Sequence, residues 1–278
     1  MAYRPSLDDL KRTCWQVRRD ILIMLEHAGS GHPGGSLSAV EILVSLYFAK
    51  LKHDPANPSW PERDRFVLSK GHCCPVLYTV LAHRGFFPKE ELMTFRRLNS
   101  RLQGHAYRGV PGVEASTGSL GQGLSIAQGM ALAARLDGRK NRVYCLMGDG
   151  EMDEGAIWEA AMEASFRKLN NLCGILDRNM VQQDAETRII KDLEPLADKW
   201  RSCGWKVIEI DGHNCAGMIG AYDAAESVTD RPTLILAHTM KGKGVSFMEG
   251  KAEWHGKAPN KQELARALQE LAENYGVR

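Results

Sequence analysis

The chain has 278 residues, of which 44% are hydrophobic and 25% are charged, an ordinary composition for a globular domain with a sizeable core. Its formal net charge of +2 argues against a protein that binds nucleic acid or an anionic membrane surface. The sequence shows neither an apolar run of transmembrane length nor a signal peptide, so we expect a cytoplasmic protein. Seven cysteines at irregular spacing favour neither a disulfide framework nor a zinc site.

Strands and helices are predicted to alternate along the chain. Short apolar runs predict strands at residues 66–68, 143–147, 172–176, 206–210 and 233–238. Helical spacing of apolar residues predicts helices at residues 7–26, 38–50, 75–83 and 124–136, and another between the second and third strands. A last helix, at about residues 260–274, opens with Asn260 and Glu263, which fit a capping box. This order predicts a single α/β domain over residues 1–278, with a doubly wound, mostly parallel sheet flanked by helices.

A turn, a loop and an apolar helix face are predicted for three further segments. Residues 29–35 are rich in glycine and are predicted to form a turn, and residues 103–123 contain six glycines and read as a loop. In the helix between the second and third strands, one apolar stripe is predicted to face the core; it consists of Trp158, Met162, Phe166 and Leu169.

Asp149 and Asn179 are the first candidate site. Asp149 lies between two glycines just past the second predicted strand, and Asn179 lies just past the third. Because open α/β sheets hold ligands beyond the carboxyl ends of their strands, the two side chains are expected to lie together. Their oxygens suit Mg²⁺ or Ca²⁺ shared with a phosphate, and the glycines let the backbone approach that phosphate. The pattern outlines a site for a diphosphate cofactor.

Four histidines lie beside glycines, in segments that could converge at one rim of the sheet. Each one alone is more often a structural residue, but four together favour a site. Neutral imidazoles both donate and accept hydrogen bonds, which suits a polyhydroxylated substrate or proton transfer near neutral pH. These candidates are His32, His72, His105 and His255. His213 also follows a strand, but a role in the turn is the favoured interpretation.

Three other features have both a structural and a functional interpretation. The glycines at residues 118–123 lack the order of a dinucleotide fingerprint, which favours an ordinary turn at the start of a helix. Glu154 either stabilises a helix amino terminus or supports a metal and cofactor site, and both can hold. Lys241, in a Lys-Gly-Lys-Gly loop after the last strand, is either solvated or neutralises a diphosphate.

Taken together, these segments resemble transketolase, in particular its N-terminal half, which holds the diphosphate end of thiamine diphosphate. The matching stretches occur in family order across nearly the whole chain, at residues 29–35, 69–75, 117–124, 148–155, 177–183, 241–244 and 254–259. The resemblance implies the thiamine-diphosphate-binding fold and transfer of a two-carbon ketol unit from a ketose to an aldose, usually as sugar phosphates. It also implies Mg²⁺, with Ca²⁺ or Mn²⁺ as substitutes.

The resemblance assigns roles to individual positions. It implies that Asp149, Asn179 and the backbone carbonyl of Val181 bind the metal ion. The remaining cofactor contacts would come from His72, Gly118, Leu120, Gly150, Glu154, Asn179, Lys241 and His255. The donor sugar and the reacting centre would be lined by His32, His72, His105 and His255.

The resemblance also implies a missing half. In transketolase the glutamate that activates the aminopyrimidine ring lies in a second, pyrimidine-binding domain and acts across a subunit interface. We therefore expect a separate C-terminal subunit that carries this domain, and a dimer of heterodimers as the assembly.

Other functions remain as alternatives at this point. A deoxyxylulose-phosphate synthase or an oxo-acid dehydrogenase subunit would use the same cofactor, but Glu154 and the Trp254-His255-Gly256 segment favour transketolase. A non-catalytic binding or regulatory relative is opposed by the intact Asp149, Asn179 and four histidines. A dinucleotide-dependent dehydrogenase fits worst, because the glycine fingerprint is missing.

Overall fold

The structure is a computed structural model that describes residues 5–276. Five parallel strands form one sheet in the order β1-β2-β3-β5-β4. Their bounds are β1 Arg65–Leu68, β2 Val143–Gly148, β3 Leu172–Arg178, β4 Lys206–Asp211 and β5 Thr233–His238. All five strands predicted from the sequence are present, and the predicted parallel α/β fold is confirmed.

Ten α-helices surround the sheet within the described residues. Their bounds are α1 Leu7–Ala28, α2 Pro33–Ser38, α3 Val40–Ala49, α4 Cys74–His83, α5 Gln122–Leu136, α6 Gly155–Phe166, α7 Thr187–Ile190, α8 Leu196–Ser202, α9 Cys215–Glu226 and α10 Lys261–Tyr275. None of the helices between residues 5 and 276 combines the length and the apolar character needed to span a bilayer.

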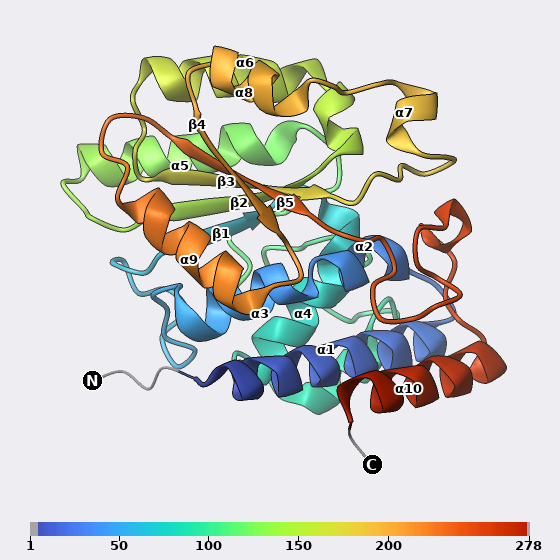
Figure 1. Ribbon diagram of the computed structural model, residues 1–278. Coiled ribbons are helices and arrows are strands. Elements are labelled where there is room, and N and C mark those ends of the chain that lie inside the picture. Colours follow the sequence, from blue (N-terminus) through green and yellow to red (C-terminus); the bar gives the residue numbers. More distant parts are fainter. Residues whose placement is uncertain (1–4, 277–278) are drawn as a thin grey trace.

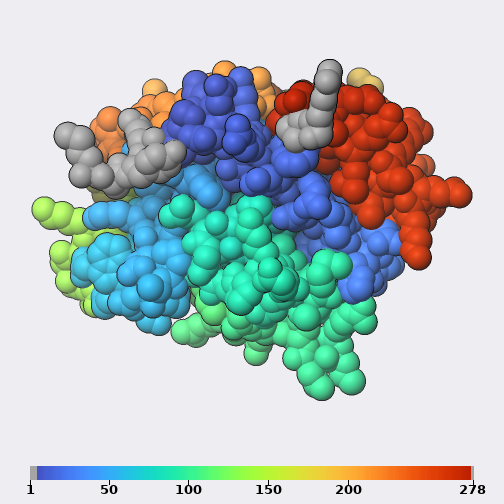
Figure 2. All heavy atoms as spheres, turned by 90° about the horizontal axis from the view of Figure 1, so that it is seen from below, coloured from blue at the N-terminus to red at the C-terminus, as the bar shows by residue number. Residues whose placement is uncertain are grey.

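Helices cover both faces of the sheet (Figure 1). On one face, α5, α6 and α8 close a core that includes Trp200 and Trp205. On the other face, α3, α4 and α9 form an inner layer, and α1 packs outside it against α10. Seen from below, the dark-blue amino-terminal helix lies beside the red carboxyl-terminal segment (Figure 2). The first and last helices are therefore joined by direct packing.

Several helix boundaries follow the capping chemistry. Ser6 and Asp9 form a capping box at the start of α1. The predicted capping box of Asn260 and Glu263 is present at the start of α10. Gly29 ends α1 in the left-handed conformation, with φ of 65°, which glycine adopts without steric cost.

Two sequence predictions are wrong in detail. The second half of the glycine-rich turn is helical, because Pro33 supplies a favourable first residue for α2 and the small glycines pack closely against neighbouring loops. Two of the four residues of the predicted apolar stripe do not face the core: Met162 and Phe166 are 56% and 75% exposed, whereas Leu169 is buried and Trp158 packs partly against the core. The buried face consists of the smaller residues Ile157, Ala160, Ala161 and Ala164. Close packing of α6 on α5 favours these small side chains.

Candidate active site

A cavity of about 420 Å³ lies where β1, β2, β3 and β5 end. Its walls come from the loops after these strands, from the turn between α1 and α2, and from the loop before α5. All of the residues predicted to form the site line this cavity: His32, His72, His105, Gly118, Leu120, Asp149, Gly150, Glu154, Asn179, Val181, Lys241 and His255. Segments distant in the sequence thus meet at one edge of the sheet.

Asp149 and Asn179 are held in place by the backbone of the turns that carry them. The Asp149 carboxylate accepts hydrogen bonds from the amides of Gly150 at 2.8 Å and Met180 at 2.6 Å. The side-chain oxygen of Asn179 accepts one from the amide of Val181 at 3.2 Å. Both side chains are nearly buried, and both residues line the cavity. The turns after β2 and β3 are therefore tied to each other through Asp149.

The donor set fits a hard divalent cation. A carboxylate, an amide oxygen and a backbone carbonyl are ligands that Mg²⁺ and Ca²⁺ accept. Lys241 Nζ donates to the carbonyl oxygens of Val181 at 2.9 Å and Gln182 at 3.0 Å, so a cationic group already contacts this loop. A metal ion at the Val181 carbonyl would place a second cation on an oxygen that the lysine already contacts. Within residues 5–276 no cluster of three or more His, Cys, Asp or Glu side chains could hold a metal ion by itself.

The four histidines form one cluster in the cavity. The His32 ring lies at the centre, with its centroid 5.1 Å from that of His72, 6.1 Å from His105 and 5.4 Å from His255. His72 and His255 are stacked at 5.1 Å. Nδ1 of His255 lies 2.9 Å from Lys241 Nζ and accepts a hydrogen bond from it, which leaves Nε2 to carry the ring proton. His32 Nδ1 is buried and has no hydrogen-bond partner among the described residues.

Burial keeps the cluster uncharged. It lowers the pKa of His32 to about 4, helped by the positive charge of Arg96, and that of His255 to about 3, helped by Lys241. Burial also lowers the pKa values of His72 and His105. At neutral pH all four imidazoles are therefore neutral and can both donate and accept hydrogen bonds. Lys241 itself has its pKa lowered to about 8 by burial.

Glu151, rather than Glu154, is the buried glutamate of this region. Glu151 accepts hydrogen bonds from the Ser69 hydroxyl and from the amides of Gly121 at 2.9 Å and Gly148 at 3.1 Å. It thereby joins the loops that follow β1 and β2 to the loop before α5. Glu154 lines the cavity as the exposed N-cap residue of α6 and makes no side-chain capping bond. Glu151 was not predicted from the sequence, because burial of an acidic residue leaves no periodic signal.

A buried ion pair of Lys70 and Asp177 supports the floor of the cavity. Asp177 is fully buried and accepts hydrogen bonds from Lys70 Nζ, from the Ser38 hydroxyl and from the Thr239 hydroxyl. Burial alone would raise the pKa of Asp177, but the Lys70 charge outweighs it and lowers that pKa. The pair connects the ends of β1, β3 and β5 to α2. Neither residue was predicted as a site residue, although both lie within matched stretches, at residues 69–75 and 177–183.

Arg96 is a further residue that the sequence did not reveal. Its Nη2 donates to the carbonyl of Gly104, the residue before His105, at 3.5 Å, and its positive charge contributes to the lowered pKa values of both His32 and His105. Its Nε is buried without a partner among the described residues, and the residue adopts a φ of 59°. His213, for which a turn role was favoured, lies outside this cavity and bridges Glu41 Oε2 at 2.9 Å and the Met240 amide at 2.8 Å.

One glycine makes the loop after β1 possible. A Cβ on Gly71 would lie 2.4 Å from the carbonyl oxygen of Thr117, well inside van der Waals contact. The Thr117 hydroxyl in turn donates to the Leu68 carbonyl at 2.6 Å. Glycine at this position therefore lets the loop before α5 pack directly on the end of β1, beside His72.

Comparison with known proteins identifies one family. The family described as "Transketolase, thiamine diphosphate binding domain" matches residues 12–277. The chain is 47% identical over 264 residues to the 6-deoxy-6-sulfo-D-fructose transketolase subunit SqwG of Clostridium sp. (strain MSTE9), covering 95% of this chain and 96% of that protein. It is 41% identical to one of the subunits of the apulose-4-phosphate transketolase of Phocaeicola vulgatus, covering 92% of this chain and 91% of that one.

Single-chain transketolases are related over part of their length. Human transketolase is 40% identical over 267 residues, which cover 96% of this chain and 42% of the human protein. The crystal structure of transketolase from Campylobacter jejuni superposes with a TM-score of 0.91 at 33% identity, covering 98% of this chain and 43% of that one. The resemblance inferred from the sequence is thereby confirmed. The chain belongs to the transketolase family, in which it matches the thiamine diphosphate binding domain and corresponds to relatives that are named as separate transketolase subunits.

Proposed function

We propose that this chain anchors Mg²⁺ and the diphosphate of thiamine diphosphate at Asp149, Asn179 and Val181, and binds the donor sugar at its four histidines. A separate C-terminal subunit would supply the pyrimidine-binding domain and the activating glutamate. The observation that carries the proposal is the single cavity in which the metal-type donors and the neutral imidazoles lie together. Cofactor and sugar can therefore meet there.

The turns after β2 and β3 would hold the diphosphate end of the cofactor. Asp149 and Asn179 present oxygens to the cavity, and Gly150 has no side chain between its backbone and the cofactor space. Lys241 can release the Val181 carbonyl to the metal ion and then neutralise a phosphate oxygen. Gly118 and Leu120 also line the cavity and would contact the aminopyrimidine through their backbone. Thiamine diphosphate, when bound, supplies the carbanion chemistry that cleaves and forms the carbon–carbon bond.

The histidines would bind sugar hydroxyls through hydrogen bonds. A neutral imidazole accepts a hydrogen bond at its unprotonated nitrogen and donates one from its N–H, so each ring can hold two hydroxyls. His32 Nδ1 is a buried acceptor that a substrate hydroxyl would satisfy. His72 and His255, stacked beside Lys241, lie toward the diphosphate end, whereas His105 lies toward Arg96. We expect His72 and His255 to approach the reacting centre and His32 and His105 to bind the sugar chain.

We further propose that the donor ketose carries an anionic group at its far end. One relative is named for 6-deoxy-6-sulfo-D-fructose and another for apulose 4-phosphate, so both a sulfonate and a phosphate occur in the names of these proteins. The groups that select between them are expected on the partner subunit, since single-chain relatives extend well beyond the part that this chain matches. A dimer of heterodimers in the cytoplasm, serving pentose phosphate or related carbohydrate metabolism, is the proposed context.

Reconstitution tests this function. The chain is mixed with its C-terminal partner, thiamine diphosphate and Mg²⁺, and ketol transfer to an aldose phosphate is followed from fructose 6-phosphate and from 6-deoxy-6-sulfofructose. We expect transfer from at least one donor, and a loss of roughly 100-fold or more in kcat/KM for His32→Ala. The exposed His238→Ala variant is the control and should retain activity. An absence of ketol transfer from every ketose tested would refute the proposal.

A further inference from the structure

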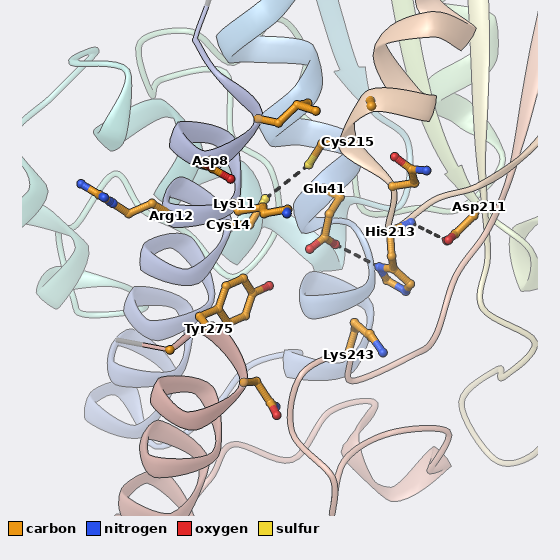
Figure 3. A pocket seen from close by; sticks show the side chains of 15 residues that line it. Asp8, Lys11, Arg12, Cys14, Glu41, Asp211, His213, Cys215, Lys243 and Tyr275 are labelled. Carbon is orange, nitrogen blue, oxygen red and sulfur yellow. Dashed lines mark hydrogen bonds and ion pairs between the residues drawn. The ribbon is translucent and has the colours of Figure 1, made fainter. Parts of the chain in front are cut away.

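A second, larger cavity lies beside the turn between β4 and α9. Its volume is about 960 Å³, and it is lined by α1, by the start of α9, by the loop after β5 and by the end of α10. Among the described residues it shares no lining side chain with the cavity that holds the four histidines. Figure 3 shows Lys11, Arg12 and Lys243 around it, together with the carboxylates Asp8 and Asp211.

Two thiols face each other in the wall of this cavity. Cys14, on α1, and Cys215, the first residue of α9, have their sulfur atoms 3.9 Å apart (Figure 3). Both side chains are almost buried, with 1% and 8% of their surface exposed, yet both line the cavity. The residues are 201 positions apart in the sequence and are brought together by the packing of α1 on α9. A disulfide needs a sulfur separation of about 2.05 Å, so closure requires only a small movement of side chains already in contact.

The two thiols differ in reactivity. Cys215 lies at the amino terminus of a 12-residue helix, where exposed backbone N–H groups favour a negative charge. The hydrogen bond with Cys14 lowers the pKa of Cys215, although burial opposes this effect. Burial raises the pKa of Cys14. Cys215 is therefore the better nucleophile, and Cys14 is placed to attack the oxidised sulfur.

We propose that Cys14 and Cys215 form a redox pair that hydrogen peroxide converts into a reversible disulfide. The Cys215 thiolate attacks one peroxide oxygen, the O–O bond breaks, and the product is a sulfenic acid and, after protonation, water. The Cys14 sulfur then attacks the Cys215 sulfur, the S–O bond breaks, and the hydroxide that leaves takes up the Cys14 proton as a second water. Two thiols are oxidised by two electrons and one hydrogen peroxide is reduced to two waters. A dithiol reverses the step by exchange.

The structural consequence is a covalent link between α1 and α9. The link would close a loop of about 200 residues that includes four of the five strands and most of the histidine cavity. Closing so long a loop restricts the unfolded chain strongly, so the oxidised chain should resist unfolding. The remaining thiols are placed differently: Cys73, Cys74, Cys145 and Cys173 are fully buried, and Cys203 follows α8 on the other face of the sheet.

Peptide mapping of the full-length chain tests the proposal. The chain is treated with hydrogen peroxide, free thiols are blocked under denaturing conditions, and the digest is analysed by mass spectrometry. We expect a linked pair of peptides that contains Cys14 and Cys215 and lacks two hydrogens, and that separates on treatment with dithiothreitol. Cys14→Ser and Cys215→Ser should each abolish this species, whereas Cys203→Ser should leave it unchanged.

Thermal unfolding gives a second readout that does not depend on the variants folding normally. Oxidised wild-type chain should melt about 5 °C or more above reduced wild-type chain. The proposal is overturned if peroxide oxidises Cys203 while Cys14 and Cys215 are recovered as free thiols. Conversion of Cys215 to a sulfinic acid without a linked peptide would also overturn it, because Cys14 would then have failed to intercept the sulfenic acid.

Discussion

Neutral histidines in the active cavity make the stability of this protein sensitive to acid. His32 and His255 have folded-state pKa values of about 4 and about 3, both below the ordinary value of 6.5. Below pH 6.5 the unfolded chain therefore binds protons that the folded chain excludes. The free energy of unfolding must fall as the pH decreases from about 6.5 toward these folded-state values.

We predict a measurable loss of stability between pH 8 and pH 5. Each of the two histidines should cost roughly 1 kcal/mol at pH 5, after allowance for their partial exposure. Melting temperatures of the wild-type chain should fall by several degrees over this range, and the double variant His32→Gln, His255→Gln should show a smaller fall. His238→Gln, at an exposed position, is the control. An unchanged pH dependence in the double variant would show that the two histidines titrate in the folded chain as they do in the unfolded chain.

The polar residues of the site differ in how well a sequence can reveal them. Asp149 and Asn179 could be placed because they directly follow apolar strands, and the strand ends of a parallel sheet are adjacent. Glu151, Asp177 and Arg96 could not, since their importance comes from burial and from partners distant in sequence. The residues adjacent in sequence predict where a residue lies along a strand or helix. They do not predict which polar side chain is buried in the folded protein.

At the scale of elements, α6 shows why periodicity alone misassigned a face. Its large residues and its alanines follow the same helical spacing on different sides, and hydrophobicity favoured the large ones. The close packing of α5 on α6 selects the small residues for the core, which leaves Met162 and Phe166 in solvent. The helices α7, α8 and α9 were not assigned individually, since they are short or only weakly amphipathic.

The exposed face of α6 is expected to contact the partner subunit. Met162 and Phe166 are exposed on α6, and Leu136, at the end of the adjacent α5, is 80% exposed. An exposed apolar patch of this kind is typical of an association surface. The double variant Met162→Glu, Phe166→Glu should weaken binding to the C-terminal subunit by roughly 10-fold or more, since charged residues are depleted from interface cores.

Binding of the two subunits can be measured by calorimetry or by surface plasmon resonance. Leu98→Glu is the matched control, because Leu98 is 92% exposed in the segment between α4 and α5. The double variant should keep the melting temperature of the wild-type chain, as both side chains lie outside the core. Equal affinity of the double variant and the wild type would place the subunit interface elsewhere.

At the scale of the whole molecule, the fold and the relatives together indicate which part of the active site this chain holds. The strand ends converge on a cavity that combines hard oxygen donors with neutral imidazoles. The relatives named as separate subunits match nearly the whole chain, whereas human transketolase extends well beyond the matched region. We therefore expect the chain to anchor a cofactor whose activation depends on another subunit.

The most direct test is a titration of thiamine diphosphate by isothermal calorimetry. The wild-type chain reconstituted with its partner should bind the cofactor only when Mg²⁺ is present. Asp149→Asn should weaken this binding by about 100-fold or more, because it removes the charged metal ligand and leaves the shape of the side chain unchanged. Asp137→Asn, at an exposed position just after α5, is the control. Equal affinity of Asp149→Asn and wild type, or Mg²⁺-independent binding, would contradict the proposed cofactor site.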